Sequence, residues 1–373
     1  MKRKHLAVAV SGALAALAAP ASFAQSTVSI SGHLDVAATS SIVNNVKLTS
    51  MHSGLNSPSR ITFSGSEDLG GGLKAKFEIQ TGLAATTQLT TSTTGTTASN
   101  TNYVISERTS TALGDRGIYV GLEGPFGEVN AGRLGHVTGA FAIGMQGVQN
   151  ALASAVGGGT AHPGQNADVV LSSQSEGRAN QAFRYNTPRV SGLQGTAFFA
   201  LGGGNGDGAQ GNRTTWVGDY TQGPLQIQLM SSTRKAYVAG VITDTGQTPT
   251  QMSSYSAFLA SNDVKERALG VKYNMGVVVL GVGNAKQTTL PGTNQKASGY
   301  SVGVPLGAWT LAAGYASITP SSGAGYKSGS LSAQYAMSKR TQVYAARRSN
   351  NQESTSTTTG AEKLSLVGVL HSF

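Results

Sequence analysis

The chain has no cysteine among its 373 residues, so neither disulfide bonds nor thiolate metal sites can hold its fold together. Charged residues make up only 12% and aromatic residues only 6% of the sequence. Its six histidines show no metal-ligand spacing. Beyond the first residues, no stretch approaches the 18 or so apolar residues of a membrane helix. These shortages exclude a disulfide scaffold, a zinc protein and a bundle of membrane helices.

The first 24 residues read as an export leader. Lys2, Arg3 and Lys4 are followed by an apolar run over residues 6–17, which is too short for the roughly 20 residues of a bilayer span. The triplet 22–24, Ser-Phe-Ala, offers the small residues that a signal peptidase requires, so we expect cleavage after Ala24. Residues 25–373 then form one domain with 24 basic and 17 acidic residues, a net charge of +7.

Apolar and polar residues alternate along most of the remaining chain. Val28, Ile30 and Leu34 alternate with Ser29 and Ser31, and this period of two is typical of a strand with two different faces. Hydrophobic residues are 39% of the chain and glycines number 50. The runs that alternate in this way are 28–36, 60–65, 73–80, 118–122, 128–131, 179–186, 195–201, 214–222, 225–231, 267–274, 277–286, 297–305, 308–318, 329–337, 341–348 and 363–373.

The connections between these runs are alternately short and long. Short Gly- or Pro-containing turns lie at 67–72, 124–127, 188–192, 223–224, 274–276, 305–307 and 338–341, whereas polar loops are expected at 40–59, 82–110, 202–213, 234–266, 287–297, 319–328 and 349–362. An even number of about 16 strands with this asymmetry indicates an antiparallel transmembrane β-barrel. A soluble β-sandwich or β-solenoid shows the same periodicity, but the leader and the turn asymmetry favour the barrel.

Four segments carry a resemblance to a known family. They are RITFSGSEDLGGGLKAKF at 60–77, YVGLEGPFGEVNAGR at 119–133, SKRTQVY at 338–344 and VGVLHSF at 367–373. In this order they resemble the trimeric general-diffusion porins of Gram-negative β-proteobacteria, and the likeness extends over nearly all of residues 25–373. The closing strand departs from the family in having Leu370 where a basic residue is common.

The resemblance implies a 16-stranded barrel in the outer membrane, assembled as a homotrimer and surrounded by outer-membrane lipids. It implies passive diffusion of small hydrophilic solutes and inorganic ions, without a cofactor. The third long loop, residues 134–177, would fold into the barrel as a constriction. The terminal Phe373 would be the signal that the barrel-assembly machinery recognises.

Strand alternation predicts which side chains line the channel. Arg60, Lys74 and Lys76 fall on the polar faces of their runs, and Arg178 and Arg184 share one parity. In the family's anion-preferring members, arginines stand at the positions of Arg60 and Arg178. A third such position holds Gly117 here, beside Arg116. Asp168 and Glu176 would supply opposing negative charge from the loop. We therefore expect a weak anion preference, with Lys74 and Lys76 lining either the channel or only its vestibule.

Three other functions compete with this reading. Residues 299–303 match the G-x-S-x-G motif of a nucleophile elbow, which requires a strand, a sharp turn and a helix, but Ser301 lies inside an alternating run. A substrate-specific channel or a barrel adhesin would share the fold. Sugar channels usually have aromatic tracks, and this chain has only Trp216 and Trp309 as tryptophans. The basic residues are scattered along the sequence, which disfavours nucleic-acid binding.

Overall fold

The computed structural model describes residues 27–43, 46–83, 113–135, 178–201, 212–236, 263–289, 293–321, 325–352 and 362–373. The expected leader and most of the expected constriction loop, with Asp168 and Glu176, lie outside the described residues. Every regular element that is described is a β-strand. Within these ranges no helix is long and apolar enough to span a membrane.

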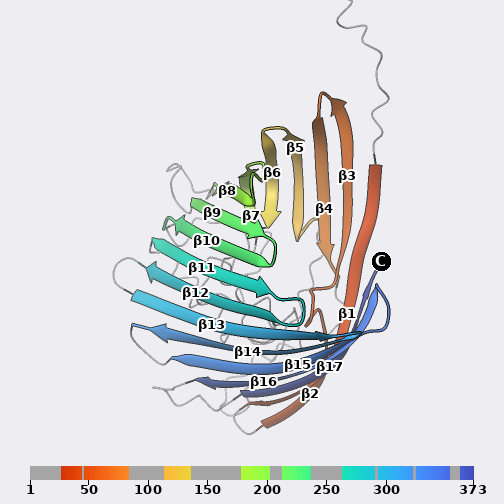
Figure 1. Cartoon of the computed structure of the whole chain (residues 1–373), viewed down its shortest axis with the longest axis vertical. Helices are drawn as coiled ribbons and strands as arrows, with labels where there is room; N and C mark the ends of the chain where they lie inside the picture. The colour runs from red at the N-terminus through yellow and green to blue at the C-terminus, as the bar shows by residue number, and fades with distance from the viewer. Residues whose placement is uncertain are drawn as a thin grey trace, which may run out of the picture.

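The strands form one antiparallel sheet that curls into a barrel (Figure 1). Its elements are β1 (Thr27–Val43), β2 (Val46–Ser53), β3 (Arg60–Gly70), β4 (Leu73–Gly82), β5 (Gly117–Gly124), β6 (Gly127–Gly135), β7 (Arg178–Asn186), β8 (Leu193–Ala200), β9 (Arg213–Gln222), β10 (Leu225–Arg234), β11 (Val264–Asn274), β12 (Val279–Thr289), β13 (Thr293–Leu306), β14 (Trp309–Pro320), β15 (Tyr326–Ala336), β16 (Thr341–Gln352) and β17 (Glu362–Ser372). Each strand from β3 to β17 pairs with its neighbours in sequence.

The sheet is closed by its first and last strands. β1 pairs with β17 from His33–Ser372 to Ile42–Lys363, and Figure 1 shows the C-terminus beside β1. On its other side, β1 pairs with β3 along its first half and with β2 along its second half. Counting β2 and β3 as one interrupted barrel strand turns the 17 strands into 16. The expected closed 16-stranded barrel is therefore confirmed, and closure removes the open edge that lipid would not tolerate.

Two of the expected long loops are wrong. Residues 40–59 were expected to be a polar loop, but β1 continues to Val43 and β2 covers Val46–Ser53, and among the described residues of this segment 54–59 lie outside the strands. Residues 287–297 are also mostly strand, because β12 ends at Thr289 and β13 begins at Thr293. Both segments are rich in Ser, Thr, Asn and Gln, which hide the strand signal because neither face is apolar.

The two faces of the barrel differ as the alternation predicts. Outward side chains are apolar and exposed, such as Val120, Leu229 and Leu331, as expected of side chains that face lipid. Inward positions are mostly polar or small, such as Ser328, Ser330 and Gln334 on β15, and these are buried. Trp216 and Trp309 are on the outward face, 62% and 48% exposed. No tryptophan track therefore lines the interior.

The turns at one end of the barrel are short, which places this end on the periplasmic side. The β3–β4 turn has three consecutive glycines, Gly70 to Gly72, all with positive φ, a conformation that is energetically unfavourable for residues with a Cβ atom.

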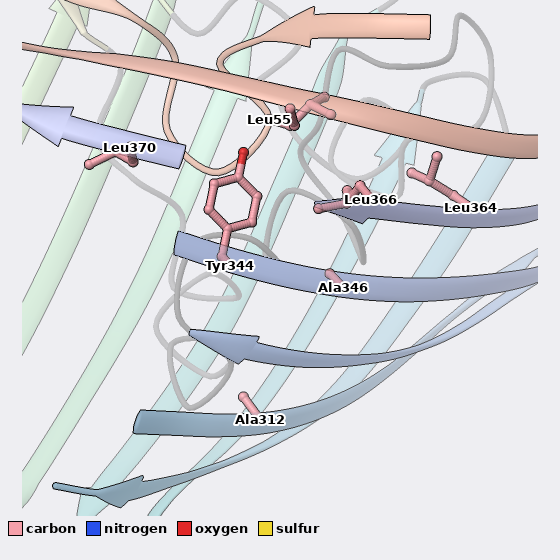
Figure 2. Close-up of a cluster of buried hydrophobic side chains, with 8 residues drawn as sticks. Leu55, Ala312, Tyr344, Ala346, Leu364, Leu366 and Leu370 are labelled. Atoms are coloured by element: carbon pink, nitrogen blue, oxygen red, sulfur yellow. The ribbon is translucent and has the colours of Figure 1, made fainter. Parts of the chain in front are cut away.

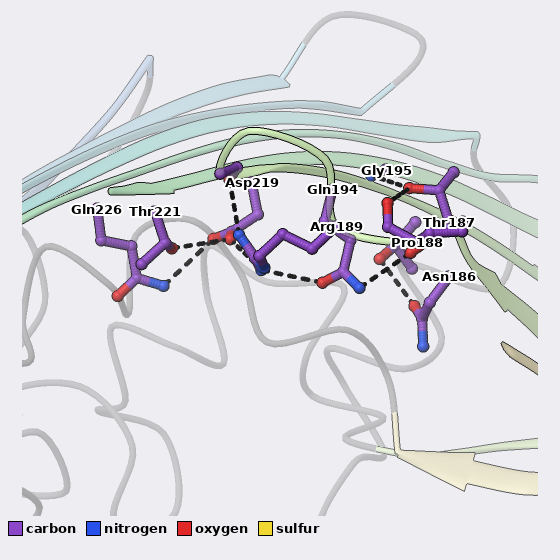
Figure 3. Close-up of polar contacts among 11 residues, drawn as sticks. Asn186, Thr187, Pro188, Arg189, Gln194, Gly195, Asp219, Thr221 and Gln226 are labelled. Atoms are coloured by element: carbon purple, nitrogen blue, oxygen red, sulfur yellow. Dashed lines mark hydrogen bonds and ion pairs between the residues drawn. The ribbon is translucent and has the colours of Figure 1, made fainter. Parts of the chain in front are cut away.

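The β7–β8 turn is held by hydrogen bonds and an ion pair of its side chains (Figure 3). Arg189 donates to the Gly192 carbonyl at 2.8 Å and forms an ion pair with Asp219 of β9 at 2.6 Å. Gln226 of β10 also donates to Asp219, at 3.2 Å, so one contact network joins two adjacent hairpins at the periplasmic rim.

Candidate functional site

A basic stretch of the inner wall runs from β3 to β7. Arg60 begins β3, and Thr62 follows on the same inward face. Thr62 is directly opposite Gln80 of β4, and Gln80 is directly opposite Gly117 of β5. These register positions bring residues of three strands to one level, near the ends of the strands away from the periplasmic turns.

Hydrogen bonds hold two guanidinium groups at this level. Arg116 Nε donates to Gln80 Oε1 at 3.1 Å, and Gln80 Nε2 donates to Thr62 Oγ1 at 3.1 Å. Arg60 Nη1 donates to the Pro58 carbonyl at 3.2 Å. Arg116 thus reaches the inward face although it precedes Gly117, the position where the family arginine was expected. The side chain compensates by its length for the offset of one residue.

Arg178 lies next to Arg116, but strand β7 does not place it on the face that the sequence parity predicts. Its Nε donates to the Arg116 carbonyl. The register of β6 and β7 shifts between Gly132 and Leu134, and Gln181 has φ 50°. Arg178 and Arg184 therefore do not share one face, and the expected common parity is wrong. A bulge adds one residue to a strand and reverses the faces beyond it, and no local pattern at Gln181 signals it.

A second arginine at this bulge was missed by the sequence analysis. Arg133 Nε donates to the Asp115 carbonyl at 2.8 Å, and its Nη1 donates to Asn180 Oδ1 at 2.5 Å. Arg133 therefore joins the segment before β5 to the start of β7. Arg184, directly opposite Asn130 on the inward face, lies closer to the periplasmic turns.

The lysines of β4 lie on the inward face near the periplasmic end. Lys76 Nζ is 2.9 Å from Glu123 Oε2 and 3.3 Å from Glu128 Oε1, and Asn130 donates to the same Glu128 oxygen at 3.0 Å. Lys76 is therefore neutralised by two carboxylates. Lys74 is directly opposite Glu123 and Asp68, so acids surround it as well. Lys74 and Lys76 therefore add little net positive charge to this part of the wall.

An inward turn, residues 54–59 between β2 and β3, lies beside Arg60. Asp35 of β1 holds it: its Oδ2 accepts from the Asn56 and Ser57 amides at 2.6 and 2.8 Å, and its amide donates to Ser59 Oγ at 2.9 Å. Asn56 and Leu55 are almost fully buried. The turn narrows the interior at the level of Arg60, and its Ser57 hydroxyl is 2.7 Å from His33 Nε2.

The inward turn also contacts the closing strands (Figure 2). Leu55 belongs to an apolar cluster with Leu366 and Leu370 of β17 and Tyr344 of β16. The Tyr344 hydroxyl donates to Asp35 Oδ1 at 2.5 Å. Its ring crosses β17 at Gly368, where a Cβ atom would lie 2.4 Å from the ring. We call Asp35, Tyr344, Gly368 and the inward turn the closure lock, because it connects β1, β16 and β17.

The G-x-S-x-G motif does not form a nucleophile elbow. Residues 299–303 lie within β13, so the motif around Ser301 is extended strand rather than a strand, a turn and a helix. In the part of the chain that is described, no group of histidines and acids is placed to hold a metal ion. Phe373 exchanges two backbone hydrogen bonds of 3.0 Å with Gly32; its role as an assembly signal stays a prediction, as do those of Asp168 and Glu176.

Comparisons with known proteins agree with this geometry. The barrel matches the anion-selective porin from Comamonas acidovorans with a TM-score of 0.70 and 20% identity, over 94% of this chain and 100% of that one. It matches outer-membrane expressed OmpT of Vibrio cholerae at 0.62 and 15%, over 93% and 98%, and Salmonella typhi OmpF in complex with daunomycin at 0.60 and 14%, over 93% and 97%.

Sequence comparison gives the family. No curated protein matches the chain significantly, but the model of the Gram-negative porin family matches residues 8–355. A closed barrel with a lipid-facing apolar exterior and a polar interior is what such a channel requires. The chain therefore belongs to the Gram-negative porins, the outer-membrane β-barrels through which small hydrophilic solutes diffuse passively.

Proposed function

We propose that this porin prefers anions weakly, and that Arg60 and Arg116 carry the preference. The observation behind this proposal is the charge distribution along the inner wall. Lys76 is paired with two carboxylates near the periplasmic end. Arg60 and Arg116 lie at the level of the inward turn, where hydrogen bonds to the Pro58 carbonyl and to Gln80 orient their guanidinium groups. Two positive charges held at this level attract anions to it. The Comamonas porin of the same fold is described as anion-selective, which agrees.

The preference would arise from the charge of the wall rather than from a binding site. Selectivity in a wide pore comes from the field of charged side chains at its narrowest part. In water, a unit charge about 4 Å from an ion contributes roughly 1 kcal/mol, and salt screens it over about 10 Å at 0.1 M. A few arginines therefore bias permeation by a small factor and do not retain the ion.

Replacing both arginines tests the proposal. In planar bilayers with a potassium chloride gradient, the R60Q/R116Q variant should lose roughly twofold to fivefold in the ratio of chloride to potassium permeability, as expected for one to two unit charges in water. The reversal potential gives this ratio directly. Glutamine removes the charge and keeps a polar amide, and the hydrogen bonds of Asp35 that hold the inward turn involve neither arginine, so the turn should remain in place.

A charge-matched control is available on the outside of the barrel. The R347Q/K363Q variant removes two outward, exposed cations, and its permeability ratio should equal that of the unmodified protein. The proposal is wrong if the unmodified channel prefers potassium, or if both variants change the ratio equally.

We also propose that three copies associate through the outward face of β3–β6. That face holds a mainly apolar groove whose lining includes Gly65, Phe77, Val120, Leu122, Val129 and Ala131. Exposed apolar patches of this kind mark protein or membrane contacts.

Light scattering of the detergent-solubilised protein tests this association. It should give the mass of three chains; the mass of a single chain contradicts the proposal. Replacing Val120 with Arg should reduce the assembly to single chains without unfolding the barrel.

A further inference from the structure

A row of cations crosses three neighbouring strands on the outside of the barrel. Arg267 of β11 is directly opposite Lys286 of β12, and Lys286 is directly opposite Lys296 of β13. All three side chains are exposed. They share the face of Leu269 and Val282, which are 41% and 48% exposed. We call these three residues the cationic row.

The row is electrostatically unfavourable in the isolated protein. Like charges directly opposite one another in a sheet destabilise it. The described outward positions of β9–β14 include no acidic residue that could offset the row. Glu266 is buried on the inward face. Asp263 lies outside the strand, where its bond from Lys235 Nζ, 2.8 Å long, lowers the pKa of its carboxyl; this acid is engaged at the rim.

From the cationic row towards the periplasm, the outward side chains change from charged to polar to apolar, as the lipid does from headgroup to acyl chain. One step towards the periplasm, Asn284 Nδ2 donates to Ser298 Oγ at 3.1 Å, beside Leu269. One step further, Val282 is directly opposite Tyr300, which is 55% exposed. Charge, then hydrogen-bonding groups, then aromatic and aliphatic side chains is the order from headgroups to acyl chains. The row lies at the end away from the short turns, which is the extracellular end.

We propose that the cationic row of Arg267, Lys286 and Lys296 binds the phosphorylated headgroup of a lipid in the outer leaflet. Strands are about 4.8 Å apart, so the row is roughly 10 Å long and can contact two phosphate groups of one headgroup. Lys and Arg at a membrane surface attract anionic lipids. A free phosphate ion would leave Leu269, Val282 and Tyr300 unused, whereas the acyl chains of a lipid cover them.

The sequence contains a reporter in the same row. Trp216 of β9 is directly opposite Ser231 of β10, which is directly opposite Arg267. Trp216 is therefore two strands, about 10 Å, from the first cation. The other tryptophan, Trp309, is at the periplasmic end of β14, where its ring centroid is 4.8 Å from that of Tyr335. Each tryptophan alone reports on the lipid at one membrane surface.

The experiment measures quenching of Trp216 in the full-length protein carrying W309F. Vesicles contain phosphatidylcholine with 10 mol% phosphatidic acid whose acyl chains are brominated near the carbonyl. We expect quenching that corresponds to a local phosphatidic acid fraction at least about fivefold above the bulk fraction, roughly the attraction of one basic residue to an anionic surface. The R267S/K286S/K296S variant should return to the bulk fraction. Trp309, observed with W216F, should report the bulk fraction throughout.

Further arms separate the row from general charge and from free phosphate. The control variant K327S/R347S/K363S removes three outward cations that are not directly opposite one another and should keep the enrichment. Inorganic phosphate replacing chloride at equal ionic strength should also leave it unchanged. In neutral detergent, the row variant should melt no lower than the unmodified barrel, which shows that it is folded.

Three results would overturn the proposal. The first is a bulk-level signal at Trp216 in the unmodified row. The second is enrichment that survives in the row variant, or that disappears equally in the control variant. The third is loss of enrichment with inorganic phosphate, which would mean that the row recognises the phosphate ion rather than a lipid.

Discussion

The D35A variant should lose about 3–5 kcal/mol of unfolding free energy. Its side chain accepts hydrogen bonds from the Asn56 and Ser57 amides and from the Tyr344 hydroxyl, and Asp35 is fully buried. Removing the acceptor leaves three buried donors without it, and each unsatisfied group costs about 1–3 kcal/mol. The loss is measured by urea titration of the barrel in detergent. At each urea concentration, the mobility on an unheated gel gives the folded fraction.

Two milder variants show whether the loss comes from the hydrogen bonds. D35N keeps one carbonyl oxygen and should cost less than D35A, while Y344F removes a single donor and should cost about 0.5–2 kcal/mol. If D35A unfolds at the same urea concentration as the unmodified protein, Asp35 does not support the inward turn. The released turn should also change single-channel conductance, because it lies beside Arg60 at the level of the basic wall.

The G368A variant should be nearly as damaging, although it adds one methyl group. A Cβ atom at this position would lie 2.4 Å from both the ring and the hydroxyl of Tyr344. The ring is buried between β17 and the inward turn, so it must leave its place and lose its bond to Asp35. We expect a loss of about 2–4 kcal/mol, from overpacking together with a broken charged hydrogen bond.

A double variant distinguishes this cause from a general intolerance of Gly368. When Tyr344 is replaced by alanine, the space for a Cβ atom exists, so G368A/Y344A should be as stable as Y344A alone. Such non-additivity is expected of residues in contact. Additive losses in the same urea titration would mean that Gly368 is required for its backbone and not for the passage of the ring. Gly329 of β15 has open space around it, so G329A is a matched control that should change little.

Most of the fold could be predicted because strand alternation and turn chemistry are local. Val28, Ile30 and Leu34 face outward as their spacing requires, and the Gly70–Gly72 turn lies where three glycines stand together. The strand residues 40–43, 46–53, 287–289 and 293–297 were not predicted because their polar residues show no apolar face. Such stretches resemble loops until pairing partners are known.

The candidate site was less predictable because it depends on register. Strand alternation predicts the polar faces of Arg60 and Lys76, but it does not predict the two carboxylates beside Lys76, which come from β5 and from the start of β6. The bulge at Gln181 separates Arg178 from the face of Arg184. Nothing around Asp35 or Tyr344 distinguishes either from an ordinary wall residue, since only barrel closure brings them together.

The closure lock also has a consequence for folding kinetics. Asp35 and Tyr344 are 309 residues apart, and contacts at such long separation form slowly because chain entropy must be lost before they are made. The inward turn can be completed only after β16 and β17 have arrived beside β1. In a barrel whose last hairpin has not docked, Asp35 therefore lacks the hydrogen bond from Tyr344. The closure lock forms only when the first and last strands have paired. A finished barrel and an unfinished one therefore differ in structure inside the channel.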